Sequence, residues 1–297
     1  MKNITFSLCF LYSFSLLGQV FPANKCIQYP SFIQKQKFNL ANSALSTSEK
    51  RKKGLWLIEI DPKNNKIKKQ LQLKTWDSAG FLGGMIFDHF GNVYSFPTPN
   101  VNIFDNPPKL SNIIYKVDGE TTKMSPWIKL DTPENLPDGN VFGIMGIAYS
   151  CFDNSIYASS VIGSTRDSIR GKIYQIDCDK QIVLDSISNF DGFGLNVLNI
   201  NNNKYLLIGS ARNSLLYYVQ LDQKGGFMHY PKPMFSIEGL GPRGDDRIKK
   251  IVYNEKENVL VISGYEFFFN LGATEQVHEQ SYGFRLDPSK NTWYRVF

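Results

Sequence analysis

Leu55-Trp56-Leu57-Ile58-Glu59-Ile60-Asp61, followed after a polar turn by Ile67-Lys68-Lys69-Gln70-Leu71-Gln72-Leu73, is the stretch that decides the fold. Apolar and polar side chains largely alternate in both halves, which is typical of strands with one buried face. Asp61 and the polar residues after it favour a tight turn between the two halves. The stretch therefore predicts a β-hairpin whose first strand ends in Asp.

The same Asp-ended pattern returns four more times. The later copies are Ile113–Asp118 with Trp127–Leu130, Lys172–Asp177 with Ile182–Leu184, Leu216–Asp222, and Tyr282–Asp287 with Trp293–Phe297. Successive terminal Asp residues lie 57, 59, 45 and 65 residues apart. These spacings suit repeat units of roughly 40 to 50 residues with longer loops added. The chain is therefore expected to be an array of similar supersecondary units.

A second hairpin pattern lies between successive copies of the first. Its four examples turn at Asp88–Asn92, Cys151–Asn154, Asn201–Asn203 and Glu255–Asn258. Two hairpins per unit make a four-stranded sheet, which is the blade of a β-propeller. We expect an all-β protein, a single β-propeller of five or six four-stranded blades. A two-sheet sandwich, the alternative, would not require so regular a doublet.

Bulk composition supports one globular domain. The 297 residues are 42% hydrophobic and 20% charged, which allows a buried core. We expect a signal peptide over residues 1–18, an N-terminal segment with a divergent first half-blade over 19–53, and the β-propeller over 54–297. The net charge is +6, and the longest basic block, Lys50–Lys53, is typical of a solvated loop. No nucleic-acid partner is therefore expected.

The first residues have the composition of an export signal. Lys2 supplies a positive charge, and residues 4–17 form a largely apolar run of signal-peptide length. Gly18 and Ala23 are the two candidate cleavage positions, with Gly18 preferred. No later segment has the roughly 20 apolar residues that a membrane-spanning helix needs. We expect a secreted or periplasmic protein without integral membrane association.

Three cysteines remain after such a cleavage, so they cannot all pair within one chain. They are Cys26, Cys151 and Cys178. Cys151 and Cys178 lie in two hairpin turns of the same predicted blade, which favours a disulfide between them. The alternative is two isolated cysteines in turns. The partner of Cys26 is left open.

Residues 83–94 carry a resemblance to known propellers. The run Gly83-Gly84-Met85-Ile86-Phe87-Asp88-His89-Phe90-Gly91-Asn92-Val93-Tyr94 resembles the blade motif of the gluconolactonase/regucalcin-like and NHL-type propellers. The resemblance implies six blades and, in the lactonase branch, a divalent metal at the mouth of the central channel. Asn196 matches the position of a metal-binding Asn, whereas Ser210, Ala211 and Arg212 stand where the family has an acid. Activity is implied only by analogy, because one fold serves many functions.

Polar residues before the inner strands should gather at one end of the propeller, which we call the loop face. The candidate Ca²⁺ ligands are Asp77, Asp138, Asp191, Asn196 and Asp246. Ordinary turn chemistry is the alternative explanation for these aspartates. The candidate ligand-binding residues are Trp76, Arg166, Arg212, Arg243 and Arg247. Pairing with nearby Asp residues is the alternative role for the arginines.

Three connections exceed ordinary hairpin length, which is common in binding loops. They span residues 97–111, 160–170 and 265–280. Within the last, Tyr265–Phe269 is predicted to continue the preceding buried strand, and a ligand wall is the alternative. His278 is read as a solvated loop residue or, alternatively, as a base.

Two functions are compatible with these features. We expect a protein that binds a small molecule or a protein partner at its loop face, because no nucleophile, base and orienting group can be assembled from the motifs. The alternative is a Ca²⁺-dependent lactonase or esterase-type hydrolase.

Overall fold

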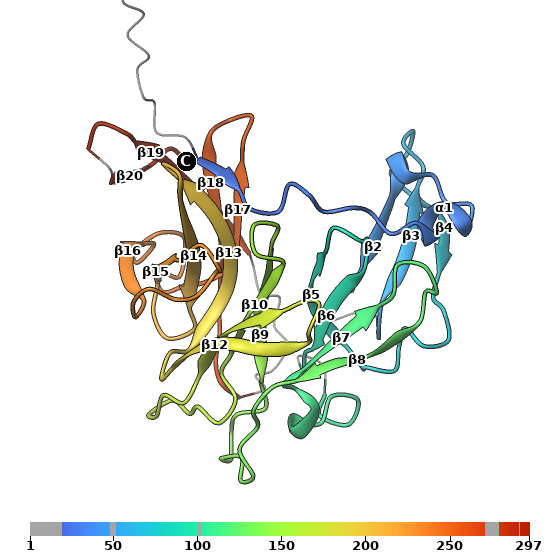
Figure 1. Cartoon of the computed structure of the whole chain (residues 1–297), viewed down its shortest axis with the longest axis horizontal. Helices are drawn as coiled ribbons and strands as arrows, with labels where there is room; N and C mark the ends of the chain where they lie inside the picture. Colours follow the sequence, from blue (N-terminus) through green and yellow to red (C-terminus); the bar gives the residue numbers. More distant parts are fainter. Residues whose placement is uncertain (1–19, 48–51, 100–101, 271–278, 291) are drawn as a thin grey trace, which may run out of the picture.

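The computed structural model describes residues 20–47, 52–99, 102–270, 279–290 and 292–297, and they form five antiparallel sheets around a central axis (Figure 1). Each sheet is one blade, and blade numbers follow the chain. The fold is the predicted all-β propeller, with five blades rather than the six that the resemblance implied. No helix among the described residues is long and apolar enough to cross a membrane.

The blades are built from consecutive strands. Blade 1 contains β2 (Ser43–Ser46), β3 (Trp56–Ile60) and β4 (Ile67–Leu71). Blade 2 contains β5 (Leu82–Phe87), β6 (Val93–Pro97), β7 (Ile113–Val117) and β8 (Met124–Lys129). Blade 3 contains β9 (Ile144–Ser150), β10 (Ser155–Ser160), β11 (Lys172–Asp177) and β12 (Ile182–Ser188).

Blade 4 contains β13 (Gly192–Ile200), β14 (Asn203–Ser210), β15 (Leu215–Leu221) and β16 (Lys232–Ser236). Its inner edge also carries β1 (Val20–Pro22). Blade 5 contains β17 (Arg247–Asn254), β18 (Val259–Tyr265), β19 (Gln280–Asp287) and β20 (Thr292–Arg295). The only other described elements are the short helices α1 (Phe32–Lys35), η1 (Leu40–Asn42) and η2 (Pro108–Leu110).

Blade 1 differs from the expected inner hairpin. Within the described part of residues 26–53, only β2 joins its sheet, and α1 and η1 precede it. The buried α1 residues Phe32 and Ile33 join the apolar cluster between blades 1 and 2. Helical turns therefore supply apolar surface at a place where the pattern predicted a further strand.

The repeated Asp explains why each blade turns where it does. In all five copies Oδ1 accepts a hydrogen bond from the backbone N–H two residues later, at 2.8 to 3.1 Å. The pairs are Asp61 with Lys63, Asp118 with Glu120, Asp177 with Asp179, Asp222 with Lys224, and Asp287 with Ser289. An Asp side chain that bonds its own backbone in this way stabilises a tight turn. The sequence repeat is therefore a repeat of one turn geometry.

Apolar clusters hold neighbouring blades together. One cluster packs blade 1 on blade 2, and others join blades 2 and 3, blades 3 and 4, and blades 4 and 5. Each cluster takes buried residues from both of its blades, for example Leu57 and Leu82, Ile114 and Ile156, Ile173 and Leu206, and Leu207 and Ile262. Among the described residues, no such cluster joins blade 5 to blade 1.

Residues 20–33 cross the face opposite the loop face, which we call the turn face, and we name them the strap. Figure 1 shows the strap, drawn in blue, running from β1, which pairs with β13, to α1 at the edge of blade 1. It pairs with β13 of blade 4, and Lys25 forms an ion pair with Glu255 of blade 5 at 2.7 Å. Gln28 donates its backbone N–H to Asp88 of blade 2. The strap therefore ties together blades that are distant in the sequence.

The strap also carries the disulfide. Cys26 is bonded to Cys151 of blade 3, across 125 residues of sequence, and Cys178 is free. The predicted Cys151–Cys178 pairing is therefore wrong. The backbone N–H of Cys151 donates to Ala23 of the strap, which places Cys26 beside Cys151. Turn position alone could not reveal this contact, because it depends on a segment far away in the sequence.

The Asp turns give a pH-dependent prediction. Backbone N–H groups that donate to the ionised carboxylate hold the pKa of Asp118 below its usual range. The stability from this turn is therefore present above the unfolded pKa of about 3.9 and is lost as the pH falls through the lower folded pKa. We expect Asp118→Ala to lower the free energy of unfolding by about 1 kcal/mol at pH 6. In urea unfolding, the difference from the parent protein should shrink near pH 2; a constant difference would contradict this origin.

The disulfide gives a second prediction. Replacing Cys26 and Cys151 together by Ala should lower the free energy of unfolding by about 2–4 kcal/mol, because the unfolded chain loses a long covalent loop. Urea unfolding measures the change, and Cys178→Ala is the control with a smaller effect. Alkylation of the unfolded chain from residue 20 onward should label one thiol before reduction and three after it. Labelling of three thiols before reduction would rule out the Cys26–Cys151 bond.

Candidate functional site

The loop face contains a cavity of about 790 Å³ between blades 3, 4 and 5. Five connections supply its walls, and each of them enters an inner strand or joins the second strand of a blade to the third. The lining residues are Asp138, Gly139, Thr165, Arg166, Asp167, Ala211, Arg212, Asp245, Arg247, Phe267, Phe268, Phe269 and Asn270. Polar connections therefore gather at one end of the propeller, as the repeat predicted.

Aromatic rings form the apolar part of this cavity. β18 ends at Tyr265, and the chain continues into the connection to β19. The Phe267 ring lies 5.3 Å from Phe142 of blade 3 and 5.0 Å from Phe193 of blade 4, measured between ring centroids. Phe268 remains 60% exposed. Residues 267–269 therefore line the cavity and do not continue the strand, so the predicted continuation of the strand is wrong for these residues, and the ligand wall stays a prediction.

Arg212 organises one side of the cavity. Its Nε forms an ion pair with the buried carboxylate of Asp191, and its Nη atoms donate to the backbone carbonyls of Thr165, Arg166 and Ser168. The guanidinium also lies over the Phe269 ring, 4.9 Å from its centroid. Most of the donors of Arg212 are thus used within the protein. Its role is to fix the loop that carries Thr165, Arg166 and Asp167.

Asp191 also holds the loop that carries Thr165, Arg166 and Asp167. Besides Arg212, it accepts hydrogen bonds from the Ser164 hydroxyl at 2.5 Å and the Gly171 backbone N–H at 3.0 Å. Burial raises the pKa of the Asp191 carboxyl, while Ser164 and Arg212 oppose that shift. The carboxylate is fully engaged, so it serves the loop rather than an added ligand.

Asp138, Arg166, Asp167, Asp245 and Arg247 form the rim of the cavity, which carries both signs of charge. The carboxylates of Asp138, Asp167 and Asp245 have no hydrogen bond or ion pair with any described residue. Arg166 is exposed, and Arg247 donates from Nη1 to the Asp245 carbonyl. The Nε of Arg247 is buried without a partner in the described structure. Since a guanidinium has five N–H donors, Arg247 keeps donors for a further acceptor.

Arg243 and Asp246 lie near this cavity but do not line it. The Arg243 guanidinium donates to Oδ1 of Asp246 from Nε at 2.8 Å and from Nη2 at 2.6 Å. Asp246 is 1% exposed. The neighbouring Asp245 points into the cavity instead, because consecutive residues at a strand entry face opposite ways.

The other candidate residues lie elsewhere. Trp76 is fully buried against Phe32, and its indole N–H donates to the Thr122 carbonyl at 2.8 Å. Asp77 is exposed beside it, outside the cavity. Asn196 lies within β13 and donates to the Ile251 carbonyl of blade 5 at 2.8 Å.

The structure thus brings together only part of the predicted set. Asp138, Arg166, Arg212 and Arg247 line the cavity. Within the described ranges, no group of three or more His, Cys, Asp or Glu side chains lies close enough to hold a metal ion. His278 lies outside the described residues. Ca²⁺ binding stays a prediction, and we derive no step through a metal.

Sequence reasoning did not single out Asp167 and Asp245, although both line the cavity. Asp167 lies in a connection whose length had already indicated a functional loop. Asp245 precedes the Asp that was chosen, and only the orientation of the strand entry distinguishes the two. Loop length and the position of Asp before a strand therefore identified the connections that line the cavity. They did not identify which side chains line it.

Comparisons with known proteins leave the family open. No protein-family model matches the sequence. No curated protein matches it either. Similar solved structures include an exo-beta-1,3-galactanase from Phanerochaete chrysosporium (8% identity, TM-score 0.49, 94% of this chain and 67% of that chain). A nidogen/laminin complex (10% identity, TM-score 0.44, 81% and 88%) and a luciferin-regenerating enzyme (10% identity, TM-score 0.44, 71% and 64%) also match.

This chain spans only part of the first solved structures that it matches. It covers 45%, 64% and 62% of the first three. At these identities and TM-scores, the likeness says nothing about what the present chain binds.

The anchoring role of Asp191 is testable. Asp191→Ala should lower the free energy of unfolding by about 3 kcal/mol, because it leaves Arg212 without its ion partner and two donors without an acceptor. Hydrogen exchange in residues 164–170 should accelerate. Asp167→Ala, on the same rim but without a partner, is the control and should stay within about 0.5 kcal/mol. Equal effects of the two variants would show that Asp191 has no anchoring role.

Proposed function

We propose that the chain is a binding protein whose loop-face cavity takes a small molecule, or a segment of a protein partner, with an apolar body and charged ends. The cavity carries this proposal, because the Phe267–Phe269 side chains line it together with unpaired carboxylates and the partly unused guanidinium of Arg247. Concave sites with apolar walls and a few placed polar groups are the usual form of ligand pockets. A ligand with both charge signs would satisfy both sides of the rim.

Aromatic and arginine side chains also favour recognition over chemistry. Such residues dominate binding energy at interfaces, since they bury large areas and donate several hydrogen bonds. The described lining residues include no His, Cys or Ser, and the lining carboxylates of Asp138, Asp167 and Asp245 have no hydrogen-bonded partner that would orient them as a base. The Cys26–Cys151 disulfide suits an oxidising compartment, so we propose that binding takes place outside the cytoplasm.

Three fragments with the same phenyl ring test this proposal. Phenylalanine carries both charges, 3-phenylpropionate only a carboxylate, and phenethylamine only an ammonium group. We expect phenylalanine to bind with a Kd on the order of 1 mM, which is reasonable for a fragment of this size. NMR titration should show that Arg247→Ala abolishes the response to 3-phenylpropionate and that Asp245→Ala abolishes the response to phenethylamine.

The controls separate the cavity from general surface charge. Arg170 is exposed on the same loop but outside the cavity, so Arg170→Ala should change none of the three affinities. Binding of none of the fragments, or binding that survives both cavity substitutions, would refute the proposed site.

The hydrolase alternative makes a different prediction. It rests on the resemblance to the lactonase propellers and requires Ca²⁺ at the channel mouth. A rise in Tm with 1 mM Ca²⁺ that is lost in Asp138→Ala or Asp246→Ala would favour this class. An unchanged Tm would favour simple binding.

A further inference from the structure

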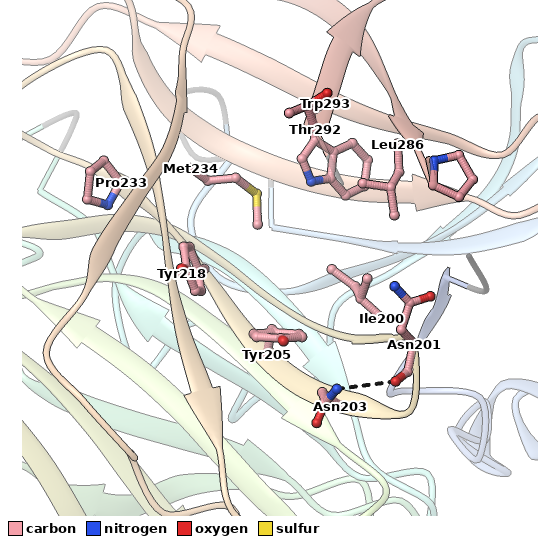
Figure 2. Close-up of a pocket in the computed structure, with 11 residues that line it drawn as sticks. Ile200, Asn201, Asn203, Tyr205, Tyr218, Pro233, Met234, Leu286, Thr292 and Trp293 are labelled. Carbon is pink, nitrogen blue, oxygen red and sulfur yellow. Dashed lines mark hydrogen bonds between the residues drawn. The ribbon is translucent and has the colours of Figure 1, made fainter. Parts of the chain in front are cut away.

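A second cavity, of about 660 Å³, lies between blades 4 and 5 on the turn face. It is lined by Ile200, Asn201, Asn203, Tyr205, Tyr218, Pro233, Met234, Leu286, Pro288, Thr292 and Trp293. Figure 2 shows Trp293 and Leu286 of blade 5 facing Tyr205 and Ile200 of blade 4 across the hollow. We call this site the interblade groove.

The interblade groove is closed at its base by packed side chains. Tyr205, Tyr218, Met234 and Trp293 are half-buried against the apolar cluster between blades 4 and 5. The Tyr205 and Tyr218 rings meet edge to face, with centroids 5.9 Å apart. These rings are therefore held in place before any ligand arrives, which lowers the entropy lost on binding.

Among the described residues, no charged side chain lines the interblade groove. This composition differs from that of the loop-face cavity, where six charged residues take part. A charged ligand would lose its hydration here without gaining an ionic partner. The groove therefore favours a neutral ligand.

Polar atoms in the groove are nevertheless free to bond. The hydroxyls of Tyr205 and Tyr218 and the indole N–H of Trp293 have no hydrogen-bond partner among the described residues, and none of them is a fully buried atom. Asn203 donates to the carbonyl of Asn201 at 3.2 Å and its Oδ1 accepts from the side-chain amide of Gln220 at 3.4 Å, so one amide N–H and one lone pair remain. The side chain of Asn201 itself has no partner in the described structure. Amides and hydroxyls can each donate and accept, which suits a ligand with many hydroxyl groups.

We propose that the interblade groove binds a neutral saccharide. A pyranose ring presents C–H groups on its faces and hydroxyls around its edge. The electron-rich face of an aromatic ring attracts such C–H groups, and Trp293 and Tyr205 offer rings on the two sides of the hollow. The edge hydroxyls then meet the free amide, indole and phenol groups.

This site is independent of the proposed loop-face function. The groove lies among the turns that join the first and second strands of blade 4 and the third and fourth strands of blade 5. The loop-face cavity lies at the opposite ends of these strands. A substitution in one site can therefore be tested against binding at the other.

Neutral tetrasaccharides test the proposal. The probes are cellotetraose, xylotetraose, laminaritetraose and mannotetraose at 5 mM, measured by saturation-transfer difference NMR, with tetragalacturonate and octaproline as charged and peptide comparators. At least one neutral sugar should bind, and Trp293→Ala should weaken it by about tenfold. Because Trp293 contacts the blade cluster, Thr292→Arg is a second variant, which fills the groove from an exposed position and should also abolish binding.

Two control variants test whether the sugar binds in the interblade groove rather than elsewhere on the protein. Tyr294 follows Trp293 on β20 but does not line the interblade groove, so Tyr294→Ala should leave the affinity unchanged. Arg247→Ala, in the loop-face cavity, should also leave it unchanged. The proposal is overturned if no neutral sugar binds, if tetragalacturonate or octaproline binds in their place, or if binding survives both Trp293→Ala and Thr292→Arg.

Discussion

The strap is the contact on which the arrangement of the blades depends. Apolar clusters join each blade to the next along the chain, but among the described residues none joins blade 5 to blade 1. The strap reaches blades 4, 3, 5 and 2 through β1, Cys26, Lys25 and Gln28, and its helix packs against Trp76 beside blade 1. The two ends of the array are thus related by a segment that crosses the turn face. Both cavities depend on this arrangement, since their walls come from more than one blade.

The two ends of the propeller offer different chemistry. On the loop face, long connections bring carboxylates, guanidiniums and phenylalanine rings to one cavity, and Asp191 with Arg212 fixes the loop on one side. On the turn face, short connections leave a groove with aromatic rings and amides but no charge. Loop length explains much of this difference, because long loops reach over the channel while tight turns remain at the edges of their own blades.

Several candidate residues were identified correctly as polar loop positions but have structural partners. Asp191 and Asp246 are buried in ion pairs with Arg212 and Arg243, so two of the four aspartates that were predicted as metal ligands are engaged by arginines that were predicted to contact a ligand. The sequence analysis gave pairing between Asp and Arg as an alternative to ligand binding. It could not decide between the two, because the partners are brought together by loop packing. Trp76 was misplaced for a similar reason: its neighbour Asp77 is exposed, while its own side chain fills the core beside Phe32.

The sequence by itself determined the strands, the turns and their repetition. Two local features carry this information: alternating side chains, and the Asp whose carboxylate accepts a hydrogen bond from the backbone two residues later. Both can be recognised from the sequence without coordinates. Only the tertiary structure decided the number of blades, the partner of Cys26 and which carboxylates face solvent. These depend on contacts between residues far apart in the chain, such as Cys26 with Cys151, and no local pattern encodes such a distance.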